Sequence, residues 1–285
     1  MRPTSPTLLG TTLAAALLAA RANAEVVDTR EIEQTIPVSA AAPLVVIVKN
    51  VMGSVRVTGH DRDSVELHAT ETVRGDLRAD IDRARAAIEL ATEQEPGRVA
   101  FRVRRRGAEG DCDCRWQQWD GYRVEYDIEV RVPRAAAIDI ATVNDGEVTA
   151  EGVHGDFTLA NVNGAVRLTG ARSGGSVNTV NGDVTVTFER VPADATQFKT
   201  VNGSLDVTYP PTLAGNLEFK TMNGDVYTDF DIVALDEPAT LERDNGRGLS
   251  RMRSNRNSAF RVGAGGTRHS FHTLNGSIYV RKAKP

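Results

Sequence analysis

The chain has 285 residues, a formal charge of −4, 40% hydrophobic and 5% aromatic residues. These values exclude a disordered polyelectrolyte and a basic nucleic-acid-binding protein, and they fit a folded chain. Valine, threonine, glycine and asparagine are frequent, which favours strands joined by tight turns.

The first 24 residues have the pattern of a secretory signal. Arg2 precedes the apolar run LLGTTLAAALLAA at 8–20, and Ala22-Asn23-Ala24 supplies the small-x-small cleavage pattern. The run is well short of the ~20 apolar residues that span a bilayer, and no later segment is long and apolar enough. We therefore expect 1–24 to be removed near Ala24 and the product to be exported to the periplasm or beyond, with no transmembrane segment.

An Asn-Gly motif then recurs along the chain. The matching segments are NVMGSVRV at 50–57, TVNDGEVT at 142–149, NVNGAVRL at 161–168, TVNGDVTV at 179–186, TVNGSLDV at 200–207, TMNGDVYT at 221–228 and TLNGSIYV at 273–280. Gly146, Gly164 and Gly182 are 18 residues apart, and Gly182, Gly203 and Gly224 are 21 apart. This period is too short for a propeller blade and predicts an all-β, single-chain β-solenoid of two-strand coils with Asn-Gly turns.

Alternation predicts which side chains line the solenoid. The residue four positions before each Asn is apolar, as at Phe198, Phe219 and Phe271, and should face inward. The residue just before the Asn is also apolar. We expect a bend that turns this second set inward as well: Val162, Val180, Val201, Met222 and Leu274.

The asparagines should form a structural ladder in which the amide of one coil hydrogen-bonds to the next. Its members would be Asn144, Asn163, Asn181, Asn202, Asn223 and Asn275. Asn and Gly tolerate the positive φ of tight turns, and we expect Asn181 and Asn202 to be buried. Antiparallel hairpins closed by each Asn-Gly are the alternative, although hairpins need not keep so regular a period.

Two stretches interrupt the repeats and set the expected organisation. After the signal come N-terminal strands and a first coil at 25–75, a helix and β-hairpin insertion or cap at 76–135, and solenoid repeats at 136–285. Within the repeats, residues 236–268 are polar and poor in apolar side chains, so we expect a surface loop there.

The hairpin tip carries two cysteines and two tryptophans that are candidate functional residues. Cys112 and Cys114 are the only cysteines, and in an exported chain we expect a local disulfide between them, with a metal or redox site as the alternative. Trp116 and Trp119 follow directly. They either cover the open end of the solenoid or bind a sugar ring or a partner protein.

The polar loop gathers arginines, among them Arg247, Arg251 and Arg253. Arginine pairs with phosphate and carboxylate, so the loop is a candidate contact for an anionic glycan, and a solvated insertion without function is the alternative. His269 and His272 should lie on opposite faces of a strand, which argues against a shared metal ion. The sequence contains no nucleophile elbow, phosphate-binding loop or calcium-binding loop, and we expect no cofactor.

In combination, these motifs resemble the bacterial family of exported β-strand-repeat proteins named "putative adhesin", a domain of unknown function. The shared features are the signal, NVMGSVRVTGHDRDSVEL, the arginine-rich hairpin ending in YRVEYDIEVRVPRAAAIDI, and the repeats that close on TLNGSIYVRK. The resemblance implies a solenoid-like fold and a place in the cell envelope, and it carries no catalytic residues to transfer.

These observations together predict a non-catalytic envelope protein with an adhesin-like binding or scaffold role, whose partner is an envelope protein or an anionic glycan. A sensing or regulatory role in envelope stress is the alternative. A carbohydrate-active enzyme is a third hypothesis, with Asp183 and Asp225 as its only candidate carboxylates.

Overall fold

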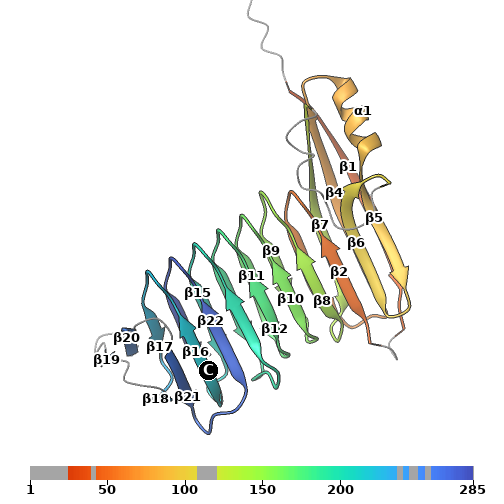
Figure 1. The fold of residues 1–285 in the computed structure, drawn as a ribbon. Coiled ribbons are helices and arrows are strands. Elements are labelled where there is room, and N and C mark those ends of the chain that lie inside the picture. Colours follow the sequence, from red (N-terminus) through yellow and green to blue (C-terminus); the bar gives the residue numbers. More distant parts are fainter. Residues whose placement is uncertain are drawn as a thin grey trace, which may run out of the picture.

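The computed structural model describes residues 25–39, 43–107, 121–235, 240–243, 250–253 and 258–284. Within them are two large sheets and one helix, α1 (Arg78–Ala87). Figure 1 shows the sheets as stacked coils, with α1 and the longest strands at one end. The predicted all-β solenoid is confirmed.

The twelve-stranded sheet has the order β1 (Val26–Pro37), β4 (Ser64–Gly75), β7 (Tyr122–Pro133), β3 (Val55–His60), β9 (Val148–Glu151), β11 (Val166–Ala171), β13 (Val184–Phe188), β15 (Leu205–Tyr209), β23 (Ile278–Lys282), β17 (Val226–Thr228), β20 (Ser250–Arg253) and β19 (Thr240–Arg243). The eleven-stranded sheet has the order β18 (Ile232–Ala234), β21 (Ser258–Val262), β16 (Gly215–Lys220), β22 (Arg268–His272), β14 (Thr196–Lys199), β12 (Gly175–Asn178), β10 (Phe157–Ala160), β8 (Ala137–Ala141), β2 (Val45–Lys49), β6 (Arg98–Arg105) and β5 (Ile88–Glu95).

Each coil contributes one strand to each sheet, and neighbouring coils pair in parallel. For example, β12 pairs with β14 so that Val177 faces Phe198, and β13 pairs with β15 so that Val184 faces Leu205. Parallel pairing rules out the alternative of antiparallel hairpins closed by the Asn-Gly pairs. Alternate residues of both sheets face inward and form one continuous apolar core, as the strand period requires.

The last coil of the chain does not lie at the end of the solenoid. Strand β22 lies between β14 and β16, and β23 lies between β15 and β17. We call β22 and β23 the interposed coil. Phe271 of this coil stacks on Phe198 at a centroid distance of 5.4 Å and on Phe219 at 5.2 Å, so both of its contacts have the geometry of an ordinary coil contact.

The glycine of the motif is required by close approach between coils. A Cβ on Gly182 would lie 2.1 Å from the carbonyl oxygen of Gly164, and one on Gly203 would lie 2.0 Å from that of Gly182. The expected positive φ at the ladder asparagines is wrong, because Asp145 is the only non-glycine with positive φ in the described part of the chain. The turns therefore require glycine because a Cβ would clash with the adjacent coil, and they do not require an asparagine in the left-handed conformation.

The predicted polar loop at 236–268 differs from what is seen. It contains strands β19, β20 and β21, and Phe260 and Val262 of β21 are buried. Strand β21 pairs antiparallel with both β16 and β18, and so continues the sheet beyond the last parallel coil. The two apolar side chains, separated by one arginine, supply the inward face that the polar composition of the segment concealed.

A buried ionic network stabilises the opposite end, where β1, β4, β7, β5, β6 and α1 lie. We call this region the antiparallel end, because β1–β4, β4–β7 and β5–β6 all pair antiparallel. The carboxylate of Glu71, 1% exposed, accepts hydrogen bonds from Arg30 at 3.0 Å, Arg85 at 2.9 Å and the Tyr126 hydroxyl at 2.6 Å. Burial, followed by the Glu71 charge, raises the pKa of Tyr126. The network fastens α1, through Arg85, to the sheet.

Candidate binding surface on the solenoid

The ladder asparagines lie along one corner of the solenoid. Their spatial order is Asn144, Asn163, Asn181, Asn202, Asn275 and Asn223, and from Asn163 onwards each side-chain amide donates to the Oδ1 of the preceding asparagine over 2.7–2.8 Å. Asn181 and Asn202 are exposed, so the expectation that they are buried is wrong. The ladder is therefore a rigid polar edge on the surface.

The buried polar row of the corner lies two residues earlier. The hydroxyls of Thr179, Thr200 and Thr273 each donate to the motif glycine carbonyl of the adjacent coil at 3.0 Å. Thr142 and Thr221 do the same, and in one coil Asn161 takes this role with its amide at 2.9 Å from the Gly146 oxygen. The threonines before the Asn were a visible signal for this row, which the sequence interpretation did not use.

The residues between the two polar rows form an aliphatic row that faces outward. Their exposed fractions are Val162 36%, Val180 39%, Val201 37%, Leu274 38% and Met222 69%. The expected inward bend is therefore wrong. Strand alternation simply continues past the buried threonine, so the next residue faces the solvent. The result is an apolar row beside the asparagine ladder.

Next to this row, the outer face of the eleven-stranded sheet changes character along the solenoid. In its middle, the outward-facing residues are uncharged. They are Thr158, Ser176 and Gln197, which alternate with buried residues along their strands. Lys199, His272 and Lys220 then follow on three neighbouring strands, each two residues before a member of the aliphatic row. His269, three residues from His272, faces the core and is fully buried.

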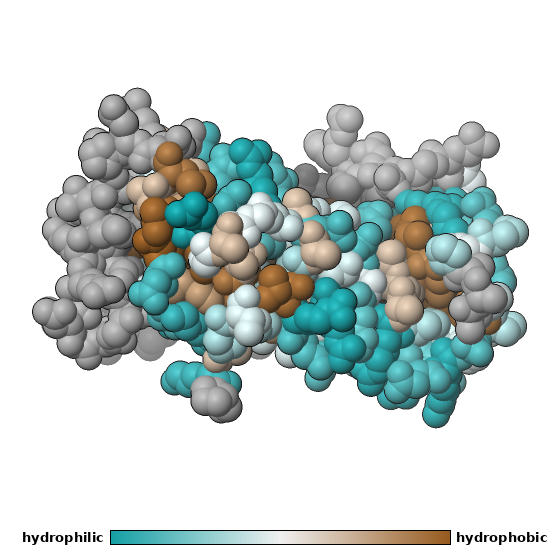
Figure 2. All heavy atoms as spheres, turned by 90° about the horizontal axis from the view of Figure 1, so that it is seen from below, coloured by the Kyte–Doolittle hydropathy of each residue, from teal (hydrophilic) through white to brown (hydrophobic). Residues whose placement is uncertain are grey.

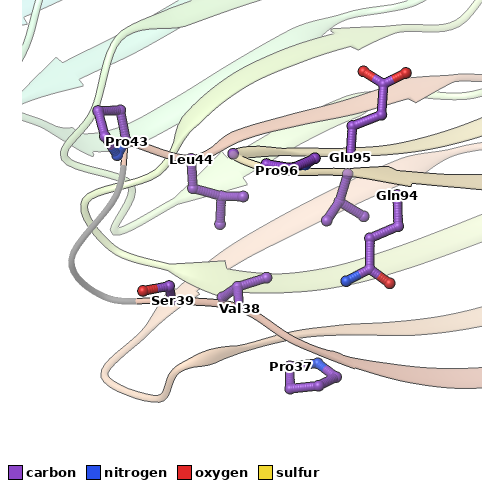
Figure 3. Close-up of a pocket in the computed structure, with 10 residues that line it drawn as sticks. Pro37, Val38, Ser39, Pro43, Leu44, Gln94, Glu95 and Pro96 are labelled. Carbon is purple, nitrogen blue, oxygen red and sulfur yellow. The ribbon is translucent and has the colours of Figure 1, made fainter.

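The surface is also hollowed away from this corner. A cavity of about 420 Å³ lies where the end of β1 meets the β5–β6 turn, and Figure 3 shows Val38 and Leu44 within it. Glu95 is the one ionisable residue that lines it, and its carboxylate points away from both, so no acid–base pair forms there. Among the described residues, no three or more His, Cys, Asp or Glu side chains group to hold a metal.

Apolar side chains are also exposed away from the corner. Figure 2 shows, from below, separate hydrophobic groups set among hydrophilic residues. Val233 and Leu235, 53% and 47% exposed, lie in or directly after β18, the edge strand of the eleven-stranded sheet. In the part of the chain that the structure describes, no helix is long and apolar enough to cross a bilayer.

Several candidate residues lie outside the described residues. These are Cys112, Cys114, Trp116, Trp119 and Arg247, together with the signal segment 1–24. Arg251 and Arg253 lie in β20, which pairs antiparallel with β17 and β19. The disulfide, the tryptophan tip and the arginine contact therefore stay predictions.

With this geometry in view, the chain can be compared with known proteins. Residues 127–259 match the family model Toastrack DUF4097. This stretch, a little under half of the chain, is therefore similar to the Toastrack family. The matched residues begin in β7 and run through the parallel coils to β21, and the interposed coil lies beyond them. This match confirms the resemblance to the adhesin-like family of unknown function.

Solved structures with a similar outline are distant. One is a "putative cell adhesion protein" from Clostridium sporogenes, 11% identical, covering 89% of this chain and 100% of that chain with a TM-score of 0.42. Another is a "putative adhesin" from Bacteroides fragilis, 12% identical, covering 89% and 97% with a TM-score of 0.38. No curated protein matches the chain. At these scores the neighbours carry no argument about what this chain binds.

Proposed function

We propose that this protein is an exported, non-catalytic protein of the cell envelope that binds another molecule in an adhesin-like manner through the corner of its solenoid. One observation carries the proposal. The corner exposes five aliphatic side chains in a row, fixed on one side by buried Thr–Gly hydrogen bonds and on the other by the asparagine ladder.

Rigidity makes this row suitable for binding. Parallel coils lie ~4.8 Å apart, and the hydrogen bonds on both sides of the row hold its members at that spacing. A surface that is already ordered loses little conformational entropy when it binds. Aligned apolar side chains that face water are unfavourable in the free protein. A partner that covers them removes this apolar surface from water, which favours binding. The signal-like residues 1–24 support export, and the resemblance to the adhesin-like family supports a binding role.

The test is retention of the protein, residues 25–285, on washed envelope fragments. Val180→Ser, Val201→Ser and Leu274→Ser combined should abolish retention, because they remove the apolar contact and leave the charge unchanged. Thr149→Ser, Thr185→Ser and Thr208→Ser combined are the matched control on the outer face of the other sheet. Equal retention of the corner variant and the wild type would refute the proposed surface.

Export is tested by N-terminal sequencing of the protein isolated from the periplasm. The mature protein should begin at Glu25, and a start at Met1 would contradict export by cleavage.

A further inference from the structure

The interposed coil builds a row of cationic and imidazole side chains that chain order alone would not build. Lys199 on β14 faces His272 on β22, and His272 faces Lys220 on β16. If the coils followed chain order, the two lysines would lie on adjacent strands ~4.8 Å apart, where like charges destabilise a sheet. Insertion of β22 separates them by two strand spacings with a histidine between. We call Lys199, His272 and Lys220 the cationic row.

The charge of this row is not compensated within the described part of the protein. Neither lysine has an ion pair among the described residues, whereas Lys49, at the other end of the same sheet face, pairs with Asp139 at 2.7 Å. Glu218 is the carboxylate nearest to the row along β16, and Arg268 pairs with it at 3.2 Å. A positive row therefore persists on a protein whose overall charge is negative.

The electrostatics of His272 agree with this placement. Burial lowers the pKa of His272, and the positive charges of Lys199 and Lys220 lower it further, while Glu218 acts in the opposite direction. Both lysines therefore lie close enough to act on the ring. At neutral pH the imidazole is uncharged and offers one N–H donor between two ammonium groups. The row presents hydrogen-bond donors at every coil.

An apolar row runs beside these donors. Val201, Leu274 and Met222 each lie two residues after a member of the cationic row, on the same outward side of the strand. A ligand that lies along the solenoid axis would meet a donor on one side and an aliphatic side chain on the other, at each coil.

We propose that the cationic row and the aliphatic row beside it bind a linear glycan that carries a carboxylate on each sugar, with the glycan lying along the solenoid axis across the last three coils. The inference rests on the proposed binding function and names its ligand class. The two lysines lie two strand spacings, about 10 Å, apart, so each can meet a different carboxylate of a polymer that repeats its charge along its length. The carboxylates of the glycan accept charge-assisted hydrogen bonds from lysine, and the C–H faces of its rings pack on Val201, Leu274 and Met222.

The experiment measures binding of residues 25–285 to polygalacturonate oligosaccharides by calorimetry at low and moderate salt. Lys199→Gln with Lys220→Gln should weaken binding about tenfold, the loss of two exposed ion pairs, and 0.5 M salt should weaken the wild type in the same direction. Lys49→Gln, on the same sheet face, is the matched control and should bind as the wild type does. The methyl-esterified glycan, which lacks the charges, should bind as weakly as dextran.

Three results would overturn the inference: equal affinity of the double variant, equal affinity for dextran, or tighter binding of polyphosphate than of polygalacturonate. The last would assign the row to a phosphate polymer instead. The two proposals fail separately. If polygalacturonate does not bind while the corner serine variant still loses envelope retention, the ligand class is wrong and the binding surface stands. If retention also survives the serine variant, both are wrong.

Discussion

The antiparallel end and the parallel coils pair the polar side chains of neighbouring strands in different ways. At the antiparallel end, strands of unlike sequence face one another, so glutamate on β5 can pair with arginine on β6, as Glu93 does with Arg104 at 3.0 Å. In the coils, the same motif position stacks on itself, and a charge would face its own kind. Amides and hydroxyls donate and accept at once, so they can repeat without conflict.

The two regions therefore differ in how their polar stabilisation is distributed. The antiparallel end concentrates its polar energy in a few buried ionic contacts around Glu71, whose loss leaves charges without partners. The coils spread theirs over many small neutral contacts, each repeated once per coil. Four substitutions test this contrast.

Glu71→Ala should lower the free energy of unfolding by about 3–5 kcal/mol, because it leaves Arg85 and the Tyr126 hydroxyl without their buried acceptor. Urea unfolding measures the change. Glu129→Ala, which removes an exposed pair with Arg56 at 3.8 Å, is the control and should cost less than about 1 kcal/mol. Similar losses for the two variants would mean that the buried network is no stronger than a surface pair.

Acidification should act on the coils through His269. Burial lowers the pKa of His269 to about 4, so the unfolded chain, with a usual value near 6.5, binds the proton first. Stability is complete above pH 6.5 and falls as the pH drops from 6.5 to 4, by about 3 kcal/mol for this group.

The measurement is urea unfolding across this pH range for the wild type and His269→Leu. Thr196, the hydrogen-bond partner of His269 at 2.9 Å, keeps the Tyr209 hydroxyl at 3.2 Å in the variant. The variant curve should be flatter. Since several carboxylates also titrate at the acid end, the difference between the two curves is the informative quantity. Parallel curves would show that His269 is not protonated on unfolding in this range.

Thr200→Val should cost about 1–2 kcal/mol, because it removes the buried hydroxyl that donates to the Gly182 carbonyl and keeps the shape of the side chain. Thermal unfolding is a suitable measurement. Thr185→Val, on the outward side of β13, is the matched control and should leave the midpoint nearly unchanged. If the two variants unfolded at the same temperature, the Thr–Gly bonds would have no net stabilising effect.

Asn202→Ala should cost less than about 1 kcal/mol, although it removes two ladder hydrogen bonds, because the exposed amides of Asn181 and Asn275 can bond to water instead. The same thermal unfolding assay applies, with Thr200→Val as the internal comparison. A loss larger than that of Thr200→Val would show that water does not replace the ladder.

The repeat of the sequence was enough to predict the solenoid, because spacing and alternation act locally on each coil. Glu71 was also within reach. It follows Val65, Leu67 and Ala69 at alternate positions, so its inward side was implied by parity. The outward direction of Val180 and Val201 was missed because a bend was assumed where alternation in fact continues.

The position of the last coil could not be predicted in this way. Thr200, Thr221 and Thr273 introduce nearly identical motifs, so any of the three coils offers the same local contacts to the others. The motifs alone therefore leave the neighbour open, and the sequence of the intervening segment, which contains β18 and β21, resembles a loop. The cationic row depends on this choice of neighbour and so escaped prediction too.

The interposed coil also has a consequence for how the molecule is made. Synthesis delivers residues 215–262 before 268–282, yet the second segment lies between the first and the rest of the stack. Strands β16 and β17 can therefore pair with β21 and β20 at once, but they cannot pair with β22 and β23, their parallel neighbours, until residues 268–282 have been made. Until then they can pair with β14 and β15 in a register that the motif permits, and the last coil must displace that pairing. Assembly of this part of the stack therefore waits for residues 268–282.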